Sequence, residues 1–363
     1  MGKPIIGHRG KETSALLQRI KPKLKQIFGT TQDVLIVTGS GTAGLEAAFV
    51  NTVKPDDEVL VIVTGAFGDR FIKICEAYNT KPHRYDVNWG EAVNPDAIKT
   101  YLKENPRIKV VFSTFCETST GVLNPIKELA AVVHQNSDAL LVVDGVSCVG
   151  GTETKMDTWG VDVCITGSQK AMMLPPGLAF MAVSGRAWKV IKKNERPRFY
   201  LDLEKYRDNL LQDGTPFTPA ISLLFGLEQA LKLMNEEGLE QVYERHRLMM
   251  NMTRAAFKQL NIPLLTSDKS ASPTVTAIKP HDFQVEALRN VLKKEFNLSV
   301  AGGQQHMKGE IFRIGHMGYC SPADVLQTIS IIEIGLRKIG KQIELGQGTG
   351  AAQEIYLSRE DVR

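Results

Sequence analysis

One lysine, Lys170, stands in an apolar setting that could change its chemistry. It follows the run VDVCITGS (161–168) by two residues and precedes AMMLPPG (171–177). Burial lowers the pKa of a lysine ammonium because the charged form is costly to desolvate, and the resulting neutral amine can attack an aldehyde to form an imine. A lysine at a strand end can instead extend its ammonium to solvent. Its neighbours must decide between the two roles.

Asp144 ends another apolar run, ALLVVD (139–144). A carboxylate at the carboxyl end of a buried strand needs a partner, because burying it unpaired is costly. The protonated nitrogen of a pyridine ring would be such a partner, and the ring would then accept electrons when a substrate Cα loses its proton. The alternative is that Asp144 caps the following helix.

The segment TGSGTAGLEAA (38–48) combines a glycine-rich turn with the start of an amphipathic helix. The backbone N–H groups of Gly41, Thr42 and Ala43 would point at an anion there, and a phosphate fits this position. The segment matches neither GxGxxG nor GxxxxGK[ST], which argues against dinucleotides and nucleoside triphosphates.

Three further residues could bind a flat ring or its substrate. Phe67 in GAFGDR could stack on the ring, and Thr118 in CETSTG could hydrogen-bond an exocyclic oxygen. Loop packing and helix capping are the alternatives for these two. Arg313, inside EIFRIGHMG, should seek a carboxylate, either that of a substrate or that of a structural salt bridge.

Short apolar runs that alternate with helical patterns must position these residues. The pattern predicts an α/β layout with a sheet buried on both faces and a ligand site at its carboxyl edge. We expect an N-terminal segment (1–15), a large domain (16–230), a smaller α+β domain (231–340) and a polar tail (341–363) that is frayed or depends on a partner. The expected strands are 33–39, 58–65, 108–115, 139–146, 161–168 and 178–184, followed by a long helix (222–260), a strand (274–280), a helix (282–296) and a strand (310–318).

The bulk composition excludes several classes of protein. The sequence has 44 Lys and Arg against 40 Asp and Glu, with no basic block, so a nucleic-acid partner is not expected. No apolar stretch approaches a membrane span, and the N-terminus lacks the apolar core of a signal peptide. The five cysteines are widely spaced without CxxC, which favours buried thiols in the cytoplasm.

Six motifs, in this order along the sequence, resemble class V aminotransferases of fold type I, most closely the alanine–glyoxylate and serine–pyruvate branch. They are TGSGTAGLEAAFVN, ETSTGVLNPI, VVDGVSCVGG, TGSQKAMMLPPG, TPFTPAIS and FRIGHMG. The resemblance covers nearly the whole chain and implies a mostly parallel, seven-stranded sheet in the large domain, with pyridoxal 5'-phosphate as cofactor. Relatives usually carry a Gly-Pro-rich segment near the substrate ahead of PIIGHRGKE, which this sequence does not show.

The resemblance also assigns roles residue by residue. Lys170 would hold the cofactor as a Schiff base and act as the catalytic acid and base, and Arg313 would hold the substrate carboxylate. The implied cofactor-binding residues are Gly41, Thr42 and Gln169 at the phosphate, Asp144, Val146, Phe67 and Thr118 at the ring, and Thr215 or Thr218 at the phosphate of a neighbouring protomer. A homodimer with shared active sites follows from the last assignment.

The resemblance therefore implies a ping-pong transaminase that moves an amino group from alanine or serine to glyoxylate or pyruvate. Aspartate with 2-oxoglutarate is the runner-up, and a second basic residue near the substrate would favour it; Arg70, Arg196 and Arg198 are the candidates. A lyase or desulfurase on the same fold is the alternative from another class, although no cysteine lies in the Gly/Ser-rich loop that a desulfurase needs. The role of His316, close in sequence to Arg313, stays open.

Overall fold

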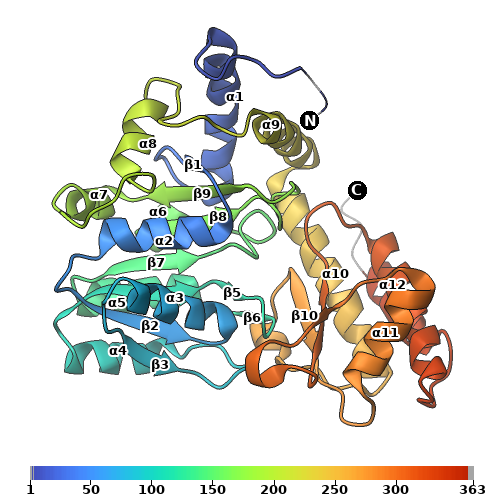
Figure 1. Cartoon of the computed structure of the whole chain (residues 1–363). Helices are drawn as coiled ribbons and strands as arrows, with labels where there is room; N and C mark the ends of the chain where they lie inside the picture. The colour runs from blue at the N-terminus through green and yellow to red at the C-terminus, as the bar shows by residue number, and fades with distance from the viewer. Residues whose placement is uncertain (1, 3, 359–363) are drawn as a thin grey trace.

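A seven-stranded sheet forms the centre of the computed structural model, which describes residue 2 and residues 4–358. Its strand order is β1-β9-β8-β7-β4-β2-β3 (Figure 1). The pairs β8-β7, β7-β4, β4-β2 and β2-β3 are parallel, whereas β9 is antiparallel to both of its neighbours, β1 and β8. β1 therefore points the same way as β8, and β9 alone runs in the opposite direction. The strands are β1 (Leu35–Thr38), β2 (Glu58–Val63), β3 (His83–Asp86), β4 (Ile108–Thr114), β7 (Leu140–Asp144), β8 (Val163–Gly167) and β9 (Leu178–Val183).

The predicted mostly parallel sheet is confirmed, and all six predicted strands of the large domain are present. The structure adds β3, which the sequence pattern missed. Its sequence HRYD is polar, and its residues alternate between exposed and partly buried because it is an edge strand.

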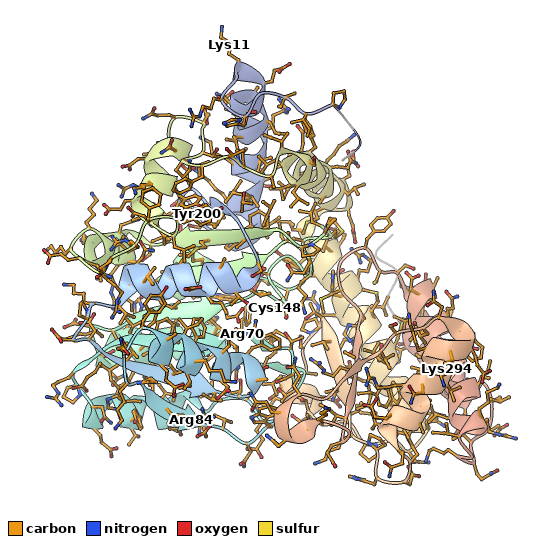
Figure 2. All side chains as sticks on the ribbon, in the orientation of Figure 1. Lys11, Arg70, Arg84, Cys148, Tyr200 and Lys294 are labelled. Atoms are coloured by element: carbon orange, nitrogen blue, oxygen red, sulfur yellow. The ribbon has the colours of Figure 1, made fainter. Side chains whose placement is uncertain are left out.

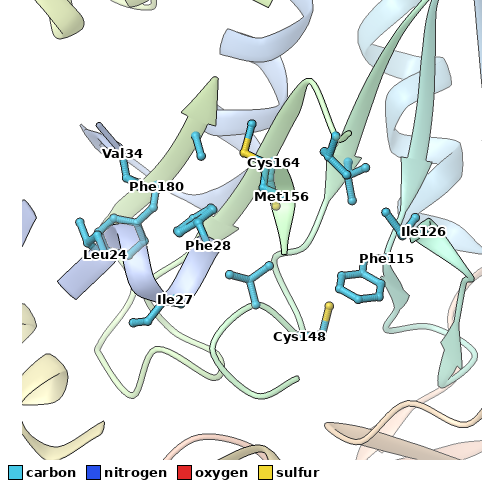
Figure 3. Packing of buried hydrophobic residues seen from close by; sticks show 14 of the residues in the cluster. Leu24, Ile27, Phe28, Val34, Phe115, Ile126, Cys148, Met156, Cys164 and Phe180 are labelled. Atoms are coloured by element: carbon cyan, nitrogen blue, oxygen red, sulfur yellow. The ribbon is translucent and has the colours of Figure 1, made fainter. Parts of the chain in front are cut away.

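Helices cover both faces of this sheet, as predicted. Successive residues of β2 point to opposite faces: Leu60 and Ile62 join one apolar cluster, and Val59, Val61 and Val63 join the other. Figure 3 shows part of the first cluster, which includes Phe28 and Phe180. The helices of the first face are α1 (Lys11–Phe28), α4 (Pro95–Glu104), α5 (Ile126–Asn136), α6 (Met156–Trp159) and α9 (Ile221–Glu237), and those of the second are α2 (Gly41–Thr52), α3 (Ala66–Ala77), α7 (Gly185–Ile191) and α8 (Leu203–Leu210).

The C-terminal part forms a smaller α+β unit at the carboxyl edge of the large sheet (Figure 1). Its antiparallel sheet has the order β10-β12-β11, and a separate hairpin pairs β5 with β6. The predicted helix over 222–260 is wrong as one element, because Gly238, with φ +87°, separates α9 from α10. The remaining elements are β5 (Cys116–Glu117), β6 (Val122–Leu123), α10 (Leu239–Gln259), β10 (Val275–Ile278), α11 (Val285–Phe296), β11 (Ala301–Gly302), β12 (Phe312–Gly315), α12 (Pro322–Lys338) and the 3₁₀ turns at Asp268–Ser270 and Gln305–Met307.

The predicted frayed tail is wrong over its described residues. Helix α13 (Gln347–Leu357) packs against α10 and α12, and Ala352 is buried with Met252 and Ile329. Residues 359–363 of the predicted tail lie outside the described residues. Within residues 2 and 4–358, no helix has the length and apolar character of a membrane span.

Candidate active site

The candidate site lies at the carboxyl edge of the large sheet, where the turns after several strands meet. Lys170 lies in the turn after β8, and Ser168 fixes this turn. The Ser168 hydroxyl donates to the Pro175 carbonyl (2.7 Å) and accepts from the Leu178 N–H (3.1 Å). The Lys170 carbonyl accepts from the Met173 N–H (3.1 Å). The backbone that carries the lysine is therefore held at several points.

The surroundings of Lys170 favour its neutral amine. Burial is the largest cause that lowers its pKa, and the positive charges of Arg313 and Arg70 lower it further, against the opposing influence of Cys116 and Asp144. Lys170 is partly buried rather than extended into solvent. The structure thus contradicts the surface-lysine alternative and brings Lys170 within the electrostatic reach of the other candidate charges.

Asp144 ends β7, directly beside β8, and is only 4% exposed. Its Oδ1 accepts from the Val146 N–H (2.9 Å). Burial raises the pKa of Asp144 to about 6, while the charges of Arg70 and Lys170 oppose this rise. A turn rather than a helix follows Asp144, so the helix-cap alternative is wrong.

The turn at Gly41 is closely packed against residues of two other loops. A Cβ atom at Gly41 would lie 2.8 Å from Cγ2 of Val146, which explains the glycine at this position. Helix α2 begins at Gly41 without a side-chain cap, so the N–H groups of Gly41 and Thr42 have no acceptor within the helix, whereas the Ala43 N–H, also expected to face an anion, donates to the Ser40 carbonyl (2.9 Å). The Oε1 atom of Gln169 is buried and has no hydrogen-bond partner among the described residues. Gly41, Thr42, Val146 and Gln169 therefore form a cradle with unsatisfied donors and one unsatisfied acceptor.

Arg70 joins this cradle from helix α3. Its Nη1 donates to the Thr42 hydroxyl (3.0 Å), and its guanidinium lies 4.5 Å from the centroid of the Phe67 ring. Figure 2 shows Arg70 near the edge of the large sheet that faces the C-terminal part. Of the three arginines considered for a second carboxylate, Arg70 is the one that the structure brings to the site.

The other two arginines have structural roles. Arg196 donates to the carbonyls of Val53, Lys54 and Tyr78. Arg198 donates to backbone carbonyls of its own loop, at Ile191, Asn194 and Arg196, and pairs with Asp202 and Glu204. Both therefore fix loops.

Arg313 reaches the site from β12 of the smaller sheet and is 7% exposed. Its Nε and Nη2 donate to the Gly302 carbonyl (3.1 and 2.8 Å), and its Nη1 donates to the Thr118 carbonyl (2.7 Å). None of the recorded ion pairs among the described residues involves Arg313, so the structural salt bridge is not found. A buried guanidinium with only neutral partners retains its capacity to bind a carboxylate.

Thr118 and its surroundings complete the ring-facing part of the site. Thr118 is buried, and its hydroxyl exchanges a hydrogen bond with the Ser147 hydroxyl. The sequence pattern missed Ser147 and the neighbouring Glu117. The signal for Glu117 was a carboxylate in an otherwise apolar and neutral stretch, FSTFCETSTG.

Three of the residues considered from the sequence lie apart from this constellation. The Thr215 hydroxyl donates to the Phe217 carbonyl (2.9 Å), and Thr218 is exposed. Both were expected to reach the phosphate of a neighbouring protomer. The structure contains one protomer, so this assignment stays a prediction. His316 is buried in the smaller part, where its ring bonds Thr276 (2.9 Å) and the Pro273 carbonyl (2.9 Å), and burial lowers its pKa to about 4. It supports packing rather than facing Lys170.

The cysteines and potential metal ligands point to no further centre. All five thiols are free; four are buried and Cys320 is partly buried. Burial raises the pKa of each thiol, which opposes the thiolate that a desulfurase requires. Among the described residues, no group of three or more His, Cys, Asp and Glu side chains could hold a metal ion.

Comparisons of the sequence identify the family of this chain. The class-V aminotransferase family profile matches residues 4–322. The chain is 43% identical to an uncharacterized aminotransferase of Methanocaldococcus jannaschii, over 98% of this chain and 93% of the relative. It is 42% identical, over the same shares, to a Synechococcus protein named as the small subunit of a soluble hydrogenase. It is 34% identical to the L-aspartate–glyoxylate aminotransferase of Paracoccus denitrificans, over 97% of this chain and 91% of the relative.

Comparison of the structure gives the same result. The ureidoglycine–glyoxylate aminotransferase of Bacillus subtilis superposes with a TM-score of 0.91 at 30% identity, over 98% of this chain and 93% of that one. The fold and the family match therefore agree. The chain belongs to the class-V aminotransferases of fold type I, and it is a pyridoxal-phosphate-dependent transaminase that transfers an amino group to a 2-oxo acid.

Proposed function

We propose that Lys170 is the residue that binds the cofactor and moves the proton in this transaminase. The observation that carries the proposal is that Lys170 lies within electrostatic reach of a buried carboxylate, Asp144, and of a buried guanidinium, Arg313, which has no carboxylate partner among the described residues. The N–H groups of Gly41 and Thr42, which have no acceptor within α2, support the fit of a phosphate, and the Gln169 amide would turn to donate to it through Nε2.

The cofactor-binding roles follow from this arrangement. Gly41, Thr42 and Gln169 would hold the phosphate, and Arg70, which already donates to Thr42, would add a positive charge. Asp144 would face the ring nitrogen, Phe67 and Val146 would contact the ring, and Thr118 would donate to its exocyclic oxygen. When bound, pyridoxal phosphate supplies the aldehyde and the electron sink of the reaction.

The protein supplies orientation and proton transfer. Arg313 would hold the substrate carboxylate in place, which fixes the direction of the Cα–H bond. Lys170, whose pKa is lowered, would remove the proton from Cα as a neutral amine and return it to the neighbouring carbon. Proton transfer by a positioned group contributes on the order of 10²- to 10⁴-fold to a rate.

For the substrates, we propose alanine or serine as donor and glyoxylate or pyruvate as acceptor. Glyoxylate stands in the names of the Paracoccus and Bacillus relatives. Aspartate is a second candidate donor, because the Paracoccus relative is named for L-aspartate. We further propose a cytoplasmic homodimer in which Thr215 or Thr218 reaches the phosphate of the other protomer, with the division between large and small domains near residue 230.

Replacement of Lys170 tests the proposed function. Lys170→Ala should abolish transamination and change the visible absorbance of the bound cofactor, whereas Lys294→Ala, at an exposed lysine, should leave both unchanged. A panel of alanine, serine and aspartate against glyoxylate, pyruvate and 2-oxoglutarate identifies the substrates. Retained turnover in Lys170→Ala would overturn the assignment, and release of ammonia or sulfide without a 2-oxo acid would favour the lyase alternative.

A further inference from the structure

Glu117 is a fully buried carboxylate in the middle of the candidate site, with 0% exposure. Its side chain accepts from the N–H groups of Phe67 (3.1 Å), Gly68 (3.0 Å) and Ser119 (3.0 Å), and from the Ser119 hydroxyl (2.5 Å). Every one of these partners is a donor. The geometry therefore suits an ionised carboxylate, although burial raises the pKa of Glu117 and these hydrogen bonds only oppose that rise.

These hydrogen bonds cap helix α3 from a distant part of the chain. The residue before α3 is Gly65, which has no side chain to cap the helix. The Ser119 hydroxyl accepts from the Ala66 N–H (2.9 Å), and Glu117 accepts from the next two N–H groups. A Cβ atom at Gly65 would lie 2.4 Å from Cγ of Glu117, so this glycine makes room for the cap. The first turn of α3 is thus fixed by residues about fifty positions away.

The same contacts fix three groups that face the cofactor and substrate. Phe67, the proposed ring contact, is itself one of the capped residues. Thr118, the proposed partner of the ring oxygen, lies between the two capping residues, and its carbonyl accepts from Arg313. A shift of Glu117 would consequently move the first turn of α3, which follows β2, and the segment that contains Thr118, which follows β4. Arg313 on β12 would shift with them.

We propose that Glu117, assisted by Ser119, is a positioning residue of the active site that sets the places of Phe67, Thr118 and Arg313. This inference rests on the proposed cofactor-binding roles of Phe67 and Thr118. Glu117 acts through these residues and is not itself proposed to touch the cofactor or substrate.

The chain offers a matched control in Glu333, which is 1% exposed and caps α13 in the same manner. Glu333 accepts from the N–H groups of Gly346 (3.1 Å), Gly348 (2.6 Å) and Thr349 (3.2 Å), and from the Thr349 hydroxyl (2.9 Å). It lies on α12 in the smaller part, among none of the proposed site residues. Glu333→Gln therefore removes an equivalent cap without changing the site.

The experiment compares Glu117→Gln, Glu333→Gln and the parent chain. In each cofactor-free protein, hydrogen exchange reports the protection of the capped amides, and thermal unfolding reports stability. Titration with pyridoxal phosphate, followed by visible absorbance, then gives the cofactor affinity. A glutamine replaces one acceptor oxygen by an NH2 group, which would face the N–H groups of Phe67 and Gly68 or that of Ser119, so the cap weakens and amides of α3 should exchange faster in Glu117→Gln.

Both variants should lose thermal stability, but only Glu117→Gln should bind pyridoxal phosphate at least about tenfold more weakly, the range expected when hydrogen bonds to a charged group are lost. Glu117→Gln with the affinity of the parent, or an equal loss in Glu333→Gln, would overturn the positioning role. A parent chain that binds no pyridoxal phosphate would overturn the proposed cofactor site itself, so the two failures are distinguishable.

Discussion

The substitution Arg313→Lys tests how the site recognises a carboxylate. Arg313 uses three hydrogen bonds to hold the carbonyls of Gly302 and Thr118. A guanidinium carries further N–H groups, and one on each terminal nitrogen has no partner among the described residues. These two N–H groups form the fork that a substrate carboxylate would accept from.

The magnitude follows from the number of donors. A lysine ammonium has three donors and no fixed fork, so it cannot serve both carbonyls and both oxygens of a carboxylate. Loss of one charge-assisted hydrogen bond costs about 1.5–3 kcal/mol, which corresponds to a decrease of about 10- to 150-fold in kcat/KM for an amino acid. A carbonyl that loses its partner should lower the free energy of unfolding by about 1–3 kcal/mol.

The assay compares an amino acid with an amine that lacks the carboxylate, such as alanine with ethylamine. The rate of the first half-reaction, followed by cofactor absorbance, should fall for alanine in Arg313→Lys and stay nearly unchanged for ethylamine. The preference for alanine should therefore shrink by the same 10- to 150-fold range, here an order-of-magnitude expectation. If Arg313→Lys retained the parent's preference for alanine, the assignment of Arg313 to the substrate carboxylate would be refuted.

Two pH-dependent predictions follow from buried titratable groups. Burial raises the pKa of Asp144 from 3.8 to about 6, so the folded cofactor-free chain binds the proton more tightly than the unfolded chain does. Protonation of Asp144 therefore stabilises the folded chain at low pH, and this stabilisation is lost as the pH rises from about 4 to about 6. Asp144→Asn should thus raise the stability of this chain by up to about 3 kcal/mol at pH 7.5 and by nothing at pH 3.5, while weakening cofactor binding; equal unfolding curves at pH 7.5 would contradict this. Burial lowers the pKa of His316 from 6.5 to about 4, so the unfolded chain binds a proton first and stability is lost as the pH falls from about 6.5 to about 4. In His316→Asn, the free energy of unfolding should fall by up to about 3 kcal/mol less over this pH range, as measured by urea unfolding. If the pH dependence were unchanged, the pKa of His316 would not be lowered in the folded chain.

The sheet was predictable where burial leaves a continuous apolar run, and less so elsewhere. β7 and β8 are buried along their whole length, so their sequences contain little else than apolar residues up to the site. β3 was not predicted, because an edge strand needs no continuous apolar run. Helix α13 was not predicted for another reason. Its buried positions include Gly348 and Ala352, and its cap, Glu333, comes from another helix, so its own residues show only a weak helical pattern of apolar residues.

A site residue was predictable from the sequence where it ends a buried strand or lies in the turn that follows one. Lys170 and Asp144 qualify, because parallel strands bring their carboxyl ends to one edge whatever the details of packing. The role of Arg70, in contrast, depends on contacts between α2 and α3 that no local pattern encodes. Glu117 is the extreme case, since the N–H groups that explain it come from residues about fifty positions earlier in the chain.

The charges around Lys170 indicate how substrate binding would prepare the proton transfer. Arg313 and Arg70 both lower the pKa of Lys170, and Asp144 raises it. A substrate carboxylate bound to Arg313 would neutralise that guanidinium, and a phosphate beside Arg70 would do the same on the other side. Each ligand removes one cause of the low pKa, so we expect the pKa of Lys170 to rise with each of them and to be highest once both are in place. The Lys170 amine, freed when the substrate takes its place on the cofactor, would then be most ready to accept a proton from the Cα–H bond in front of it.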